Sequence, residues 1–156
     1  MPSQPQEIDV YQKILVPTDG STLSKKAVVH AIGLAHLNNA ELVVLKVVPR
    51  YPVSYFEGGM SLPAPEIADI ENQWAAHAQG IVDAAVKLAN KQGVAAKGAI
   101  VKSDVVSEAI ISAAKKHKCD LVVMASHGRK GVKRLLLGSE TQHVLTHSHT
   151  PVLVLR

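Results

Sequence analysis

The chain has 156 residues, of which 47% are hydrophobic and only 3% aromatic. This length fits one domain with a buried core, and the apolar content excludes a disordered chain. The net charge of +4 comes without a basic stripe interleaved with aromatic residues, which argues against a nucleic-acid ligand. Cys119 is the only cysteine, which excludes an intrachain disulfide and favours a reducing compartment, the cytoplasm.

The start of the chain differs from the rest. Residues 1–10 are polar, with two prolines and no apolar run of the kind a signal peptide needs, so they are predicted to be a flexible tail. Residues 11–156 are predicted to form a single domain. No apolar run approaches the ~20 residues of a membrane helix, so no membrane partner is expected.

The first predicted element is a strand over residues 13–16, ended by Pro17. A turn is expected at residues 19–21. Apolar residues at helical spacing then predict a helix over residues 24–37, which Asn38 and Asn39 close.

The second strand is predicted over residues 41–48, and Pro49 ends it. Residues 49–65 form a loop that is long for a compact domain, and such loops tend to be functional. A long helix is predicted over residues 66–92, with Gly93 as its C-cap. Steps of three and four residues predict one buried stripe on this helix: Ile67, Ile70, Trp74, Ala78, Ile81, Ala85 and Leu88.

The remaining elements continue the alternation. They are a weak strand of edge type over residues 94–101, a helix over 105–118, a strand over 120–125, a short helix over 139–147 and a last strand over 152–155. Strands alternating with helices predict an open five-stranded parallel sheet with helices on both faces, a Rossmann-like α/β fold. Ligands of such sheets bind beyond the carboxyl ends of the strands, where the strand order reverses.

The segment after the fourth strand has the composition of an anion site. Gly128, Gly131 and Gly138 let the backbone approach a ligand closely, and Ser139 is a candidate N-cap with Gln142 at capping-box spacing. A helix starting there directs free N–H groups outward. Four basic residues lie nearby: Arg129, Lys130, Lys133 and Arg134. An ordinary loop with a basic surface remains the alternative.

The first strand ends at Asp19, which could accept hydrogen bonds from ribose hydroxyls or simply cap the following helix. Neither the P-loop pattern nor the dinucleotide fingerprint is present. Any nucleotide site must therefore have another design.

Four runs of sequence together resemble the universal stress protein family over residues 11–156. They are ILVPTDGS from Ile14, VVMASHG from Val122, LLGS from Leu136 and PVLVL from Pro151. The ATP-binding branch of that family has the pattern G-x-x-G, nine residues, G-[ST]. Gly128, Gly138 and Ser139 match its last three fixed positions, whereas Ala125 replaces the first glycine. A slightly tighter fit is expected there.

The resemblance implies an adenine-nucleotide-binding fold of the alpha hydrolase-like type that binds ATP with Mg²⁺. It implies that Asp19 holds the ribose, that Pro17 and Thr18 line the adenine pocket and that the Val47 backbone meets the adenine edge. Two further groups are expected around ribose and phosphate: Met124, Ala125 and Gly128, then Gly138, Ser139, Glu140 and Thr141. Where the family often has Gly-x-Pro before the third helix, this chain has Asp104. Its charge could oppose phosphate, but it is expected to cap that helix.

His143 and His147 stand four residues apart, a spacing that can chelate a metal. No acidic or cysteine ligand lies close by in sequence, so a surface pair without a metal is expected. Cys119 is expected to be an inert small hydrophobe.

The leading functional prediction is an ATP-binding regulatory or stress-response module. The rival is a slow ATPase or phosphoryl-transfer enzyme using the same pocket, and a nucleotide-free member of the family is a third option. The last strand, placed at a sheet edge, predicts a homodimer, as the resemblance also implies. An edge shielded by the N-terminal tail is the alternative.

Overall fold

The computed structural model describes residues 10–52, 62–128 and 136–156. Strands and helices alternate along these ranges as β1 (Lys13–Pro17), α1 (Thr22–Asn38), β2 (Glu41–Val48), α2 (Ala64–Lys91), β3 (Ala96–Lys102), α3 (Val106–Lys116), β4 (Leu121–Ala125), α4 (Ser139–His147) and β5 (Val152–Leu155). All strand pairs are parallel, which confirms the predicted α/β class. The predicted tail lies outside the described residues except for Val10.

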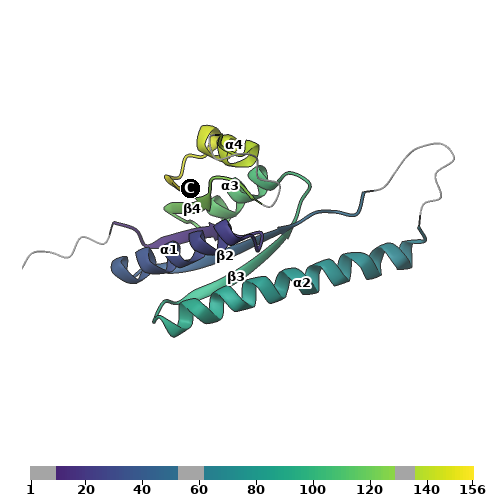
Figure 1. The fold of residues 1–156 in the computed structure, drawn as a ribbon, viewed down its shortest axis with the longest axis horizontal. Coiled ribbons are helices and arrows are strands. Elements are labelled where there is room, and N and C mark those ends of the chain that lie inside the picture. Colours follow the sequence, from purple (N-terminus) through teal and green to yellow (C-terminus); the bar gives the residue numbers. More distant parts are fainter. Residues whose placement is uncertain (1–9, 53–61, 129–135) are drawn as a thin grey trace, which may run out of the picture.

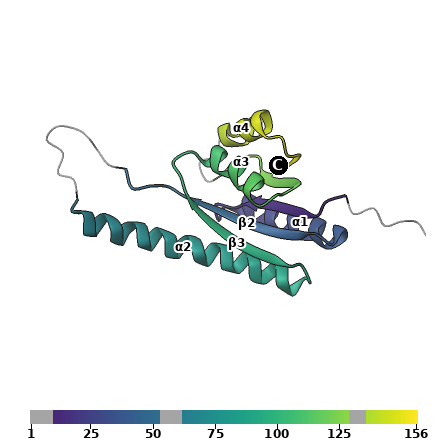
Figure 2. The same cartoon turned by 180° about the vertical axis from the view of Figure 1, so that it is seen from behind.

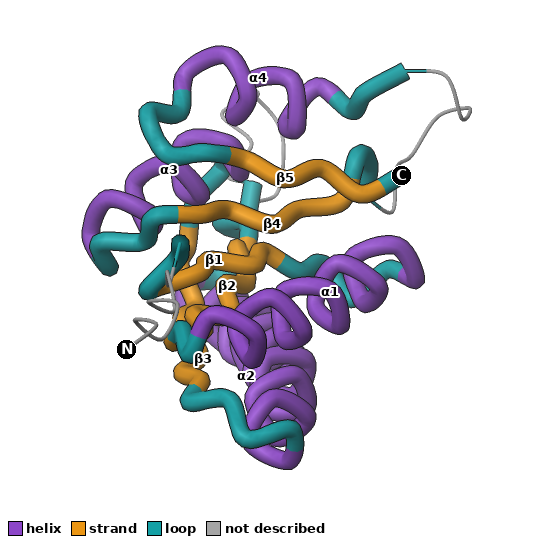
Figure 3. Tube along the Cα trace, turned by 90° about the vertical axis from the view of Figure 1, so that its left-hand side faces the viewer, coloured by secondary structure: helices purple, strands orange, loops and turns teal. Residues whose placement is uncertain are grey.

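The sheet has the strand order β3-β2-β1-β4-β5 (Figure 3). The chain builds outward from β1 through β2 to β3, then returns to place β4 and β5 on the other side of β1. The strand order therefore reverses between β1 and β4. The predicted edge positions of the third and fifth strands are both confirmed.

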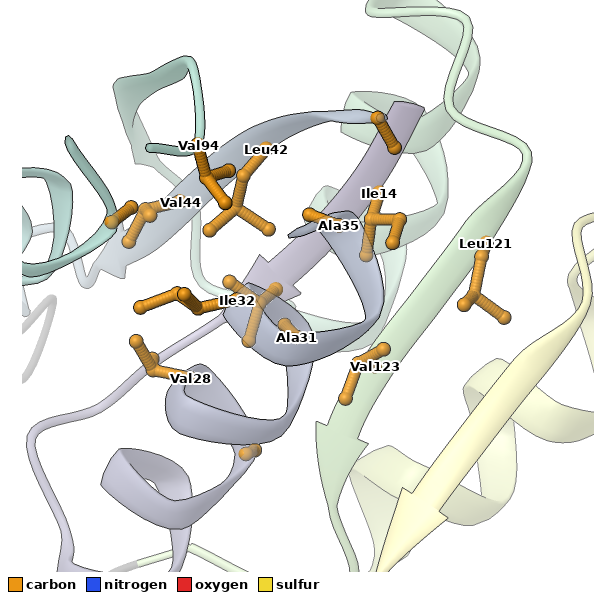
Figure 4. Packing of buried hydrophobic residues seen from close by; sticks show 14 of the residues in the cluster. Ile14, Val28, Ala31, Ile32, Ala35, Leu42, Val44, Val94, Leu121 and Val123 are labelled. Atoms are coloured by element: carbon orange, nitrogen blue, oxygen red, sulfur yellow. The ribbon is translucent and has the colours of Figure 1, made fainter. Parts of the chain in front are cut away.

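Two apolar cores cover the two faces of the sheet, because successive strand side chains point to opposite faces. Ile14 and Val16 of β1 pack with α1 and α2, whereas Leu15 packs with α3 and α4. Figure 4 shows the first core, in which α1 presents Val28, Ala31, Ile32 and Ala35 to strand residues that include Leu42, Val44 and Val123. The low aromatic content of the chain is consistent with this core, because small branched side chains and alanines let the helices and the sheet approach closely.

Helix α2 follows the predicted buried stripe only in part: Ala78 is buried and Ala85 packs against the first core, whereas other predicted positions do not lie in a core. It runs past the end of the sheet (Figures 1 and 2), so its first turns have no strand beneath them. Trp74 is only half-buried and stacks on Tyr51 with ring centroids 6.1 Å apart, so its predicted place in the core is wrong. Leu88 is exposed, whereas Val82 and Ala89 are fully buried. None of the helices described here is long and apolar enough to cross a membrane.

The ends of α1, α2 and α3 shift by one or two residues from their predicted places, whereas α4 has its predicted bounds. Helix α1 begins at Thr22 because the Ser21 side chain accepts a hydrogen bond from the Ser24 N–H. It closes at Asn39, whose φ of 52° is left-handed, as the asparagine pair predicts. Gly93 follows α2 with φ of 77°, a conformation that favours glycine.

Candidate functional site

The two segments singled out in the sequence meet where the strand order reverses. β1 and β4 are neighbours in the sheet, so their carboxyl ends lie at the same edge. Asp19 follows β1 and Gly128 follows β4. A β-carbon placed on Gly128 would lie 2.5 Å from Asp19 Oδ2. Only a glycine therefore fits against this carboxylate without a shift, and the structure brings the two predicted site residues into direct contact.

The end of β1 is held by short-range hydrogen bonds. The Ser21 N–H donates to Asp19 Oδ1 at 2.9 Å, and the Thr18 hydroxyl lies 3.1 Å from the Ser24 hydroxyl. Gly20, with φ of 79°, donates its N–H to the Thr18 hydroxyl oxygen. Ser21 is the N-cap of α1, so the capping alternative for Asp19 is wrong: Asp19 stabilises the turn and directs its second oxygen toward Gly128.

Val47 lies two residues beyond Leu45, the last residue of β2 that pairs with β1. The Thr18 N–H donates to the Leu45 carbonyl at 2.9 Å, and this is the last bond between β1 and β2. Because strand backbone groups repeat every second residue, the groups of Val47 face the same side, past the end of β1. The Lys46 ammonium donates to the Val47 carbonyl at 3.1 Å. The contact of the Val47 backbone with an adenine edge stays a prediction.

The end of β4 is held by bonds across a longer stretch of chain. The Gly138 N–H donates to the Ser126 carbonyl at 2.7 Å, and the buried Thr141 hydroxyl donates to the Ala125 carbonyl at 2.9 Å. A β-carbon on Gly138 would lie 3.2 Å from the Ser126 carbonyl oxygen. These bonds attach the first turn of α4 to the end of β4. Ser126 is a structural residue of this site that the sequence reasoning missed.

Helix α4 begins at Ser139 as predicted, but its N-cap is the residue before. Gly138 is its N-cap, and the helix has no side-chain capping bond. The predicted N-cap role of Ser139 and its capping box with Gln142 are therefore wrong. The Gln142 N–H instead donates to the Gly138 carbonyl as the first helical bond. The N–H groups of the first turn lie next to the strand ends, where the helix dipole favours an anion.

Glu140 caps a neighbouring helix. Its Oε2 accepts a 2.6 Å hydrogen bond from the Ser107 N–H, in the first turn of α3. Asp104 was expected to cap α3 but accepts a bond from the Arg50 N–H at 3.1 Å instead, so that prediction is wrong. Glu140 caps α3 because folding places α4 beside α3. No local sequence pattern predicts this proximity.

The remaining predicted site residues line the same edge of the sheet. Met124 is buried in the second core, whereas Pro17 and Ala125 are half-buried at the ends of their strands. Gly131 and the four basic residues named with it fall outside the described ranges. The structure thus brings two groups of predicted residues together at the reversal point: Pro17, Thr18, Asp19, Ala125 and Gly128, then Gly138, Ser139, Glu140 and Thr141.

Cys119 lies at the opposite, amino end of β4. It is a buried free thiol, and burial raises its pKa to about 11. The thiol is protonated at neutral pH, as expected of an inert residue.

Comparison with known proteins gives a consistent answer. The model of the universal stress protein family matches residues 10–156. A universal stress protein of Methanocaldococcus jannaschii, MJ0531, is 35% identical over 149 residues, which cover 95% of this chain and 84% of that protein.

Solved structures agree in fold. The universal stress protein UspA from Lactobacillus plantarum superposes with a TM-score of 0.79 at 27% identity, covering 94% of this chain and 98% of that one. A universal stress protein solved in complex with cAMP superposes with a TM-score of 0.64 at 28% identity, covering 94% and 97%.

Proposed function

The chain belongs to the universal stress protein family, and we propose that it is an ATP-binding module of the stress response that works by changing a partner interaction. The observation that carries this proposal is the contact between Gly128 and Asp19 where the strand order reverses. This contact places the Asp19 carboxylate beside the carboxyl ends of both β1 and β4. Ligands of parallel sheets bind at this point of the fold.

Each part of the site suits one part of an adenine nucleotide. Asp19 would accept hydrogen bonds from ribose hydroxyls, and the Val47 backbone would face the adenine. The first turn of α4, from Gly138, would bind phosphate through its N–H groups. Mg²⁺ would be held chiefly by phosphate oxygens and water, as is usual for this ion. The complex of a related protein with cAMP supports an adenine nucleotide as the ligand class.

Ala125, the departure from the family pattern, is compatible with this site. It is half-buried at the end of β4, and its carbonyl is already bonded by the Thr141 hydroxyl. The methyl group it adds is the smallest side chain that could replace a glycine. We expect a tighter approach of ribose or phosphate here rather than loss of binding.

The nucleotide content of the purified protein tests the proposal. Denaturation should release an adenine nucleotide, identified by chromatography and mass spectrometry, in a ratio near one per chain. A preparation that carries none and does not bind added ATP in a calorimetric titration would favour a nucleotide-free member of the family.

Catalysis is the less favoured function. Fast hydrolysis needs a group that positions the attacking water. Among residues 10–52, 62–128 and 136–156, Asp19 and Glu140 are the predicted site carboxylates, and both accept hydrogen bonds from backbone N–H groups. We expect turnover far below the typical median of about 10 per second. A steady-state assay with Mg²⁺ that gave turnover near that value, dependent on Asp19, would make the protein an ATPase.

We also propose that two copies pair through β5. This strand is at the sheet edge, and the side chain of Leu153 is 39% exposed. Val152 and Val154 pack in the second core, so a charge at Val154 would damage the fold itself. A backbone edge with an exposed apolar residue is normally covered in a stable protein.

Leu153→Asp tests this pairing without entering a core. Light scattering should give twice the 16.6 kDa chain mass for the parent and a shift toward one chain for the variant. Leu37→Asp, on the outer face of α1 and 78% exposed, is the matched control and should stay dimeric. A parent that is monomeric at micromolar concentration would instead favour an edge shielded by the N-terminal tail.

A further inference from the structure

Helix α1 presents one face to the core and leaves the opposite face uncovered. Its core face carries Val28, Ala31, Ile32 and Ala35 (Figure 4). The exposed positions of α1 fall within an arc of about 140° around the helix, at 3.6 residues per turn. These residues form the α1 outer face: Thr22, Lys25, Lys26, Val29, His30, Gly33, His36 and Leu37.

An apolar row runs along the α1 outer face. Val29, Gly33 and Leu37 follow one another at steps of four residues, so they lie in line along the helix. Val29 is 57% exposed and Leu37 is 78% exposed. A β-carbon added to Gly33 would have no neighbour within 4 Å, so the surface dips to the backbone between two apolar side chains. A surface hollow of about 340 Å³ at the start of this row is lined by Thr22, Lys25, Lys26, Val29 and His30.

The residues beside the apolar row include no acidic group. Lys25 and His36 lie on one side of it, Lys26 and His30 lie on the other, and α1 contains no aspartate or glutamate. Within the part of the chain that the structure describes, none of the ion pairs involves a residue of α1. Two lysines beside exposed apolar side chains are complementary to a ligand surface that is apolar in the middle and carries carboxylates at its borders.

We infer that the α1 outer face is a docking surface for an acidic amphipathic helix of a partner protein. Val29 and Leu37 are about 12 Å apart along the helix axis, a length that two to three turns of a partner helix cover. An apolar side chain of that helix would rest over Gly33, and its carboxylates would face the lysines. A lipid surface fits less well, because the face has only two large apolar side chains and no aromatic one.

The inference names the partner class of the proposed regulatory module, and its biological role rests on that proposed function. The connection to the candidate nucleotide site is short, because Ser21 is the N-cap of α1 and donates its N–H to Asp19. Docking itself depends on the surface of α1, so it is measurable on protein with or without bound nucleotide.

Fluorescence anisotropy with a labelled synthetic peptide tests the docking. The probe is a helical peptide of ~18 residues in which a row of leucines is bordered by glutamates, and the control peptide has lysines in place of the glutamates. The full chain should bind the acidic peptide at least about 10-fold more tightly than the basic one. Added salt should weaken this binding, because the charges involved are exposed.

Reversing the charge of the lysine pair should weaken binding of the acidic peptide about 10-fold or more and should favour the basic peptide. The variant is Lys25→Glu with Lys26→Glu, at exposed positions in the N-terminal half of α1, where the helix dipole does not oppose a carboxylate. Lys115→Glu with Lys116→Glu, an exposed adjacent pair on α3, is the matched control and should bind the acidic peptide as the parent does. Gly33→Leu should also weaken binding, because it fills the dip in the row without touching the rest of the chain.

The nucleotide content of each preparation, measured in parallel, separates a failure of docking from a failure of the nucleotide site. Equal binding of the two peptides, or equal binding of the acidic peptide by the parent and the Lys25/Lys26 variant, would overturn the inference. Absence of binding of the acidic peptide at about 1 mM would overturn it as well. Binding to phosphatidylglycerol vesicles in place of the peptide, lost in the same variant, would assign the face to a membrane instead.

Discussion

The two strand ends that face each other at the reversal point are stabilised in different ways. At the end of β1 the side chains of Thr18 and Asp19 are bonded to residues two to six positions away, and the Thr18 N–H also donates to the Leu45 carbonyl of the neighbouring strand. The end of β4 depends on bonds from Gly138 and Thr141, which are reached only after a loop of the chain has returned. The side-chain bonds at the end of β1 lie within a short stretch of sequence. The bonds at the end of β4 form only once α4 has docked.

This difference assigns different tasks to the two ends. A local turn keeps most of its hydrogen bonds when neighbouring elements move. It therefore suits a fixed contact, such as the one proposed between Asp19 and a ribose. The α4 end is connected to α3 through Glu140, and a shift of one helix must move the other. We expect changes at the β1 end to affect affinity more than stability, and changes at the β4 end to affect both.

The largest effect is expected where the two ends touch. In the Gly128→Val variant the new β-carbon would lie 2.5 Å from Asp19 Oδ2, so the carboxylate must move. The variant should lose both the contact of Asp19 with the ribose and space for the ligand. ATP binding should weaken about 100-fold, which corresponds to the upper end of the range for losing a hydrogen bond to a charged group. Calorimetric titration measures it. Gly33→Ala, whose β-carbon would have no neighbour within 4 Å, should bind as the parent does.

Gly138→Val tests the β4 end alone. Its β-carbon would lie 3.2 Å from the Ser126 carbonyl oxygen, and its methyl groups would stand where phosphate must approach the first turn of α4. We expect ATP affinity to fall about tenfold or more, with a lower unfolding temperature. An affinity equal to that of the parent would mean that phosphate does not bind at this helix.

Asp19→Ala tests the β1 end. Removing the carboxylate should cost about tenfold in ATP affinity, because hydrogen bonds to charged groups are worth about 1.5–3 kcal/mol. Asp19→Asn keeps an acceptor for the Ser21 N–H and should retain more of the affinity than the alanine variant. If both variants bind ATP as tightly as the parent, the ribose contact is misplaced.

Thr141→Val separates stability from binding at the β4 end. The change removes the 2.9 Å bond to the Ala125 carbonyl in a residue that is 3% exposed. The free energy of unfolding should fall by about 1 kcal/mol, the usual worth of such a bond. Urea denaturation measures this loss. A matched change at the other end, Thr22→Val on the exposed face of α1, should cost less.

The smallest effect is expected far from both ends, at Cys119. Burial raises its pKa to about 11, so the neutral thiol is favoured in the folded state. An unfolded chain titrates near the ordinary value of ~8.5, so this contribution to stability is present below that pH and is lost as pH rises toward 11. A thiol reagent at pH 8 should label the folded protein slowly and the denatured protein fast, with no effect on nucleotide content. Fast labelling of the folded chain would contradict the burial.

The sequence by itself determined the α/β class, the order of the elements and the two segments of the site. Those features rest on local signals: apolar runs, helical periodicity, prolines after strands, and glycines next to polar residues at strand ends. The turn from Thr18 to Ser21 belongs to this class, because its side-chain hydrogen bonds join residues that are near neighbours in the chain.

Only the tertiary structure decided which residues pair across the fold. The cap of α3 comes from Glu140 rather than Asp104, Trp74 stacks half-buried on Tyr51 rather than in a core, and Glu108 meets His143. Helical periodicity identifies the inward face of α2 but not where the sheet beneath it stops. These contacts depend on how whole helices and strands are positioned. The burial of apolar surface determines those positions, and the spacing of residues along the chain does not predict them.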